Sequence, residues 1–244
     1  MERNLKSLHY LYHKAIKIMK TFIKKNFILF FLFIVAFVLY ASGTNSFMLE
    51  IIFKPLIIIS LLIYLFVQGG QQEKAVNFAI GGLLLSLFGD VFLLFQEQGP
   101  LFFIAGLISF LLAHISYIFY YLRSSESSAV KKLKYKTVFI LLMVLYGIVF
   151  YFLLFTDLGG LKIPVFVYTT VLISMNIFAL NRYGKVEENS FKLIMTGAVS
   201  FAISDSLLAV NKFLLPIPIA GVWILATYAA AQYFIIQGVL SKKQ

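Results

Sequence analysis

The stretch GGLLLSLFGDVFLLF, residues 81–95, places one carboxylate, Asp90, in a run of apolar and small residues. A run this apolar predicts a helix that crosses a membrane. A carboxylate at bilayer depth costs about 2.5–3.5 kcal/mol, so it marks a functional site by default. A second carboxylate, Asp205, lies in a similar context in TGAVSFAISDSLLA, residues 196–209.

The composition of the whole chain supports a membrane protein. Of its 244 residues, 61% are hydrophobic and only 13% are charged, and the mean hydropathy is +0.93. Long apolar runs favour helices over barrel strands, because a helix satisfies its own backbone polar groups in lipid. The sequence therefore predicts an all-α, polytopic fold. With no cysteine in the chain, disulfides, thiolate metal sites and cysteine nucleophiles are excluded.

The apolar runs predict eight transmembrane helices, separated by polar or basic loops. A basic amphipathic arm, 1–25, precedes a membrane domain, 26–244, whose halves are about 26–122 and 137–240. The eight expected spans are 26–42, 51–67, 77–95, 99–122, 137–155, 161–181, 191–210 and 218–240.

The net charge of +11 is distributed as a membrane topology would require. If the N-terminus and every second loop share one side, that side holds 18 of the 21 lysines and arginines, all but Lys54, Lys162 and Lys212. The positive-inside rule then predicts a multi-pass protein of the cell (inner) membrane with both termini cytoplasmic. We expect no nucleic-acid partner and no obligate protein partner, and we expect the arm to lie on the inner leaflet.

An internal correspondence links the two carboxylates. A gap-free shift of 115 residues aligns Gly82 with Gly197 and Asp90 with Asp205. Four spans separate the copies, so the shift predicts two parallel four-helix repeats with both aspartates at one depth. In that arrangement the carboxylates would face each other near the outer leaflet.

Other polar residues in the spans are candidates for substrate binding, although each also has a structural interpretation. Lys54 either snorkels to the outer interface or holds a phosphate. His114 and Tyr117 share a helix face, deeper than the aspartates, and either join helices or contact substrate. The candidate substrate-binding residues are Lys54, Ser86, His114, Tyr117, Tyr168, Asn176, Ser204, Tyr228 and Gln232.

Several further features favour a structural interpretation. Asn176 is expected to join helices. Tyr120 and Tyr121 suggest an aromatic belt at the membrane surface, and span 137–155 suggests a scaffold. His9 and His13 lie one turn apart, but interfacial histidines are the favoured interpretation, so we expect no metal and no cofactor.

Two facing carboxylates in an apolar site are expected to share one proton, so the pair can supply a general acid and a general base. Hydrolysis of a lipid bond fits this chemistry. A proton-coupled transporter that uses the same aspartates remains an alternative. An intramembrane aspartyl protease is less consistent with the sequence, because the residues around Asp90 and Asp205 lack its usual motifs.

Several motifs in combination resemble the YhhN-like lysoplasmalogenases from about residue 54 to residue 238. They are SLFGDVFLL at 86–94, GLISFLLAHISY at 106–117, GAVSFAISDS at 197–206 and the trio Thr227, Tyr228 and Gln232. The resemblance implies a membrane hydrolase that cleaves the vinyl ether bond of a lysophospholipid, a lysoplasmalogen. It also implies that Asp90 and Asp205 are the catalytic residues.

Overall fold

The computed structural model describes residues 2–69, 73–125 and 133–241, with side chains described at Lys14 and from Met19 onward. In this part of the chain, eight helices are long and apolar enough to cross a membrane, so the prediction of eight spans is confirmed. They are α1 (Glu2–Gly43), α2 (Phe47–Val67), α3 (Val76–Leu94), α4 (Pro100–Arg123), α5 (Lys136–Leu154), α6 (Lys162–Leu180), α7 (Glu188–Ala209) and α8 (Ala220–Ser241).

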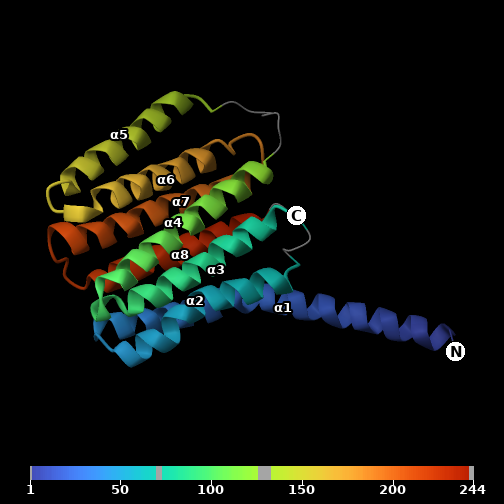
Figure 1. The fold of residues 1–244 in the computed structure, drawn as a ribbon. Helices are drawn as coiled ribbons and strands as arrows, with labels where there is room; N and C mark the ends of the chain where they lie inside the picture. The colour runs from blue at the N-terminus through green and yellow to red at the C-terminus, as the bar shows by residue number, and fades with distance from the viewer. Residues whose placement is uncertain (1, 70–72, 126–132, 242–244) are drawn as a thin grey trace.

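The helices lie side by side and alternate in direction, with both termini at one end of the bundle (Figure 1). Short 3-10 turns, η2 (Gln96–Gln98) and η3 (Gly159–Leu161), lie in two of the connections at the opposite end. A π-helical turn, η4 (Val210–Leu214), extends α7. Helix α8 packs against α7, α1, α2 and α3, whereas α5 packs mainly on α6 at the edge of the bundle.

Close helix pairs form where glycines replace larger side chains. A Cβ added to Gly82 would lie 2.6 Å from the ring of Tyr117, which brings α3 against α4. A Cβ on Gly197 would lie 2.8 Å from the carbonyl oxygen of Ala231, which brings α7 against α8. Small residues allow this approach in membranes, where van der Waals packing drives helix association. The aspartate-bearing helices, α3 and α7, therefore each belong to a tight pair.

The basic arm, 1–25, is continuous with the first span. Helix α1 continues without a break from Glu2 to Gly43, and its span begins at Met19. Its first part projects beyond the bundle as a continuation of the span (Figure 1). The side chains of His9 and His13 lie outside the described residues, as do residues 126–132 of the loop between the two halves.

A buried arginine fixes the end of the bundle where the termini lie. Arg182 is 1% exposed, donates to the hydroxyls of Ser124 and Ser190, and lies over the rings of Tyr120 and Tyr121 at 5.4 and 5.6 Å. Burial lowers the pKa of the Arg182 guanidinium below its ordinary range. The prediction of an aromatic belt at these tyrosines is wrong, because both are buried by their contacts with the cation.

Candidate active site

Asp90 is sealed inside the bundle between three helices. It lies on α3 and is 1% exposed, and the hydroxyl of Tyr228 on α8 donates to its Oδ2 at 2.6 Å. Lys54 on α2 places Nζ 3.9 Å from Oδ1, and its side chain is 13% exposed. Lys54 therefore turns inward instead of snorkelling to the surface, because the buried carboxylate attracts its charge.

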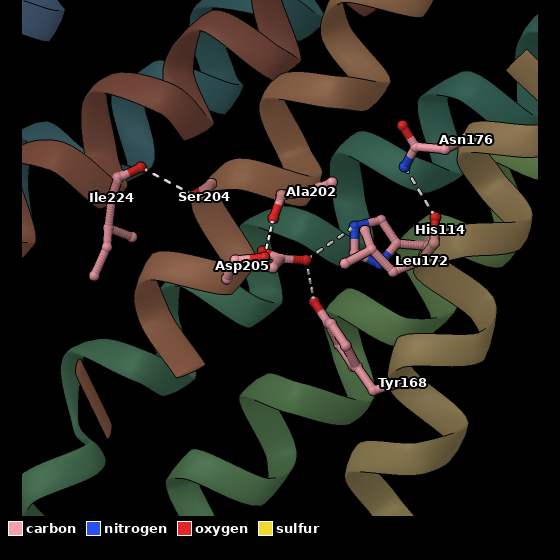
Figure 2. Close-up of polar contacts among 9 residues, drawn as sticks. His114, Tyr168, Leu172, Asn176, Ala202, Ser204, Asp205 and Ile224 are labelled. Atoms are coloured by element: carbon pink, nitrogen blue, oxygen red, sulfur yellow. Dashed lines mark hydrogen bonds and ion pairs between the residues drawn. The ribbon is translucent and has the colours of Figure 1, made fainter. Parts of the chain in front are cut away.

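Asp205 on α7 has a different pair of partners, drawn in Figure 2. The hydroxyl of Tyr168 on α6 donates to its Oδ2 at 2.7 Å. The Nε2 atom of His114 on α4 lies 3.6 Å from the same oxygen. Three helices from both halves of the chain therefore meet at this carboxylate.

The contact with His114 corrects the expected depths. We expected His114 to lie deeper than Asp205, which was placed five residues from the end of its span. Helix α7 instead continues through η4 to Leu214, so Asp205 lies nine residues, or about 13 Å at 1.5 Å per residue, from the end of the helical segment. Asp205 is thus further from its helix end than expected, and its carboxylate is within contact distance of His114.

The imidazole of His114 is fully buried beside the carboxylate. Neither of its ring nitrogens has a hydrogen bond within the described residues. The ring lies edge-on to Phe201 and Tyr168, with centroids 4.9 and 5.5 Å away. A buried nitrogen without a partner is uncommon in proteins, and here it adjoins the acid that a substrate would meet.

Asp205 lies on the wall of an apolar cavity. The cavity is lined by α4, α5, α6 and α7 with η4, and by Leu93 of α3, and most of its walls are hydrocarbon. A lining of this character suits an apolar group held by a few polar side chains. Its polar lining residues are Tyr146, Tyr168, Thr169, Asp205 and Ser206.

Tyr146 is a cavity residue that the sequence did not reveal. It lies on α5, and its hydroxyl is hydrogen-bonded to the hydroxyl of Ser206 on α7. The interpretation of this span as scaffold was therefore incomplete, because α5 supplies one wall of the cavity. The sequence signal was weak, since Tyr146 is 43% exposed and resembles any tyrosine on a lipid-facing helix.

The two carboxylates do not touch. Among the described residues, no hydrogen bond or ion pair joins Asp90 to Asp205. An aromatic ring, that of Phe110, lies between the cavity and the Asp90 site: it lines the cavity, lies edge-on to Tyr228 at 5.8 Å, and packs on Gly89 beside Asp90. A shared proton thus requires either a bridging group or a movement of this ring.

Three predicted residues form the core beside Asp90 and do not line the cavity. Tyr117 donates to the amide oxygen of Gln232 at 2.6 Å, which ties α4 to α8. Ser86 is fully buried one turn before Asp90. Tyr117 and Gln232 therefore join helices, as one of their two interpretations proposed, whereas the hydroxyl of Ser86 has no hydrogen bond within the described residues.

Two further candidates make structural hydrogen bonds (Figure 2). Asn176 donates to the carbonyl oxygen of Leu172 in its own helix at 3.0 Å. Ser204 donates to the carbonyl oxygen of Ile224 at 3.0 Å, which ties α7 to α8. Neither side chain lines the cavity beside Asp205.

Nothing in the described residues forms a cluster of three or more histidine, aspartate or glutamate side chains that could hold a metal ion. The polar groups that line the cavity are instead an acid, two phenols and two aliphatic hydroxyls, and the imidazole of His114 is buried beside the acid. Such groups can donate, accept and orient protons. The arrangement therefore suits acid–base chemistry on an apolar ligand.

Comparisons with known proteins point to one family. The profile of the YhhN family matches residues 49–239. Lysoplasmalogenase TMEM86A from Bos taurus is 27% identical over 217 residues, 86% of each chain, and the Homo sapiens protein of that name is 27% identical over 218 residues, again 86% of each. Lysoplasmalogenase from Mycobacterium bovis is 31% identical over 159 residues, 65% of this chain and 59% of its own. No solved structure matches the chain.

Proposed function

The chain belongs to the YhhN family, and we propose that it hydrolyses the vinyl ether bond of a lysoplasmalogen to a fatty aldehyde and a glycerophospho-base. The observation that carries this proposal is the position of Asp205, a largely buried acid on the wall of a cavity lined mostly by hydrocarbon. The relatives named lysoplasmalogenase supply the substrate class.

The reaction needs a proton donor directed at a carbon atom. In the proposed mechanism, Asp205 protonates the alkene carbon that is not bonded to oxygen, and the ether oxygen stabilises the adjacent carbon as an oxocarbenium ion. Water adds to that carbon and returns a proton to the site. The resulting hemiacetal breaks its bond to the glycerol oxygen, which takes a proton, and the aldehyde is released. One water molecule is consumed for each bond cleaved.

Tyr168 and His114 are proposed to orient the acid. Both contact Oδ2 of Asp205, at 2.7 and 3.6 Å. Oδ1 has no hydrogen bond from any described side chain, so it is the oxygen available to carry the transferred proton. His114, with no other partner for Nε2, is placed to accept the proton that the attacking water loses.

Asp90 is proposed as the second catalytic carboxylate, in its ionised form. Lys54 supplies the opposite charge that an ion at this depth requires, and Tyr228 donates a hydrogen bond. An anion near the cavity stabilises the developing oxocarbenium ion electrostatically. We propose that bound substrate displaces the ring of Phe110, which separates Asp90 from the cavity.

The protein is a multi-pass membrane protein with both termini at one end of the bundle. We propose that the protein lies in the inner membrane of the cell. We place the end with the termini in the cytoplasm, because 18 of the 21 lysines and arginines fall in the N-terminal arm, the C-terminal tail and the loops assigned to that side. The substrate would then enter from the surrounding bilayer, without a soluble partner.

The test is release of aldehyde by the purified chain in detergent from a defined lysoplasmalogen. Its 1-acyl ester and saturated 1-alkyl ether analogues serve as controls. We expect turnover of the vinyl ether alone, because only its alkene carbon can accept the proton. Turnover without a membrane gradient would exclude a purely transporting role. Equal cleavage of the ester, or no cleavage of the vinyl ether, would contradict the proposal.

A further inference from the structure

A second hollow lies at the opposite end of the bundle from the cavity at Asp205. It has a volume of about 1230 Å³, measured with its open side, and lies between α1, α2, α7 and α8. It shares no lining residue with the cavity. We call it the terminal groove, because α2 and α8 end there and α7 begins there.

The terminal groove changes from polar to apolar with depth. On α1 it is lined by Lys24 and, one turn further into the bundle, by Ile28. On α7 the polar Asn189 lies at the start of the helix, and Leu193 lies one turn deeper.

The other two helices of the terminal groove repeat this order. Gln68 follows the end of α2, with Tyr64 one turn deeper. Ser241 ends α8, with Gln237 one turn deeper and Phe234 about two turns deeper. All four helices thus present hydrogen-bonding groups at the membrane surface, and aliphatic or aromatic side chains lie below them together with the amide of Gln237, which matches the head and chain of an amphiphile.

Hydrogen bonds hold the rim of the terminal groove in place. The amide of Gln68 donates to the carbonyl oxygen of Lys20 at 3.1 Å, which joins α2 to α1. The amide of Asn189 donates to the hydroxyl of Ser241 at 3.2 Å, which joins α7 to α8. The groove is therefore a feature of the packed helix ends.

The charge of the terminal groove is positive. Lys24 is its only charged lining residue, and no salt bridge to Lys24 exists within the described residues. Lys20 and Lys25 add positive charge on the same part of α1. A basic site at the cytoplasmic surface attracts anionic lipid head groups, by about 1 kcal/mol for each lysine.

We propose that the terminal groove binds an anionic phospholipid of the surrounding membrane. Its phosphate and charged head group lie at Lys24 and the polar rim, and one acyl chain lies along Ile28, Leu193 and Phe234. The proposal is independent of the hydrolytic function, since the groove contains no acid and lies away from Asp205.

The test is native mass spectrometry of the full chain in a neutral detergent. Phosphatidylglycerol and phosphatidylcholine with identical acyl chains are the two probes. We expect one phosphatidylglycerol to bind in preference to phosphatidylcholine. Lys24→Ala should weaken its binding about fivefold, and Lys24→Arg should restore it. The matched control is Lys25→Ala, which removes an adjacent exposed charge that does not line the groove.

Three results would overturn the proposal: equal binding of the two lipids, equal weakening by Lys24→Ala and Lys25→Ala, or full displacement of the lipid by inorganic phosphate alone. Asp205→Asn should leave phosphatidylglycerol binding unchanged, and Lys24→Ala should leave the rate of vinyl ether cleavage unchanged. These two variants separate the terminal groove from the cavity at Asp205.

Discussion

Asp90 and Asp205 occupy similar positions in the two halves of the molecule, yet their surroundings differ. Asp90 is sealed between a lysine and a tyrosine, whereas Asp205 faces an apolar cavity beside a tyrosine and a histidine. The first site pairs its carboxylate with a cation, and the second places its carboxylate at a cavity. Similar helix positions thus give the two carboxylates different environments.

The partners of the two aspartates also correspond in position. Each carboxylate contacts the helix before its own and a helix from the other half. Under the 115-residue shift, Lys54 aligns with Thr169, the neighbour of Tyr168, and His114 aligns with Ala229, the neighbour of Tyr228. This one-residue agreement is what parallel repeats would produce, although the repeat itself stays a prediction.

The largest effect is expected from removing the acids. Asp205→Asn should lower kcat for vinyl ether cleavage by about 10²–10⁴, the usual contribution of a general acid, with the thermal unfolding midpoint preserved. Asp90→Asn should also lower kcat by at least about 10², since the proposed oxocarbenium ion loses its counter-charge. Aldehyde release under single-turnover conditions measures both.

The matched control for these variants is Asp157→Asn, an exposed carboxylate in the loop between α5 and α6 that should leave kcat unchanged. Activity of Asp205→Asn within tenfold of the unaltered protein would remove Asp205 from the reaction. Full activity of Asp90→Asn would show that Asp90 contributes to the stability of the fold and not to the reaction. The two aspartates would then have entirely different roles.

The next effect separates the two sites by stability. Lys54→Met should lower the free energy of unfolding by about 3 kcal/mol, because it leaves Asp90 buried without its cation. The double variant Lys54→Met/Asp90→Asn should recover most of this loss. Reversible unfolding in mixed micelles measures the change.

Asp205→Asn serves as the comparison for that experiment, because it leaves no buried carboxylate without its cation and should cost little stability. If the double variant is no more stable than Lys54→Met, the lysine contributes by packing and not by charge. The distinction between a charge-balanced site and an open site would then fail.

The smallest effect concerns the cavity beside Asp205. Leu208→Phe, one turn after the acid, should narrow the cavity and raise KM about tenfold for long alkenyl chains but not for short ones, since each buried CH₂ contributes about 0.8 kcal/mol. Ile203→Phe, on the lipid-facing side of the same helix, is the control. A uniform change for all chain lengths would show that the chain lies elsewhere.

Sequence alone could predict the fold and most members of the two sites. Polar residues are costly in a membrane helix, so the few that occur, such as Lys54, His114, Tyr168 and Tyr228, stand out from the apolar runs. Eight spans follow from the same contrast.

The pairing of those residues could not be predicted, because contacts between helices depend on where each helix ends. The π-helical turn after Ala209 places Asp205 further from the end of its helix than the span predicted, and nothing in the hydropathy pattern marks that turn. Tyr120 and Tyr121 resembled a membrane belt because Arg182, their partner, lies about 60 residues away. Short-range patterns carry no signal of such contacts.

The central place of α8 affects how the chain enters the membrane during synthesis. It follows the other seven spans in the chain and is the least apolar of the eight, yet half of its span is buried in the bundle. The partners of its Tyr228 and Gln232 lie on α3 and α4, which are synthesised before α8. Insertion of α8 is therefore coupled to assembly, and the earlier helices act as its template.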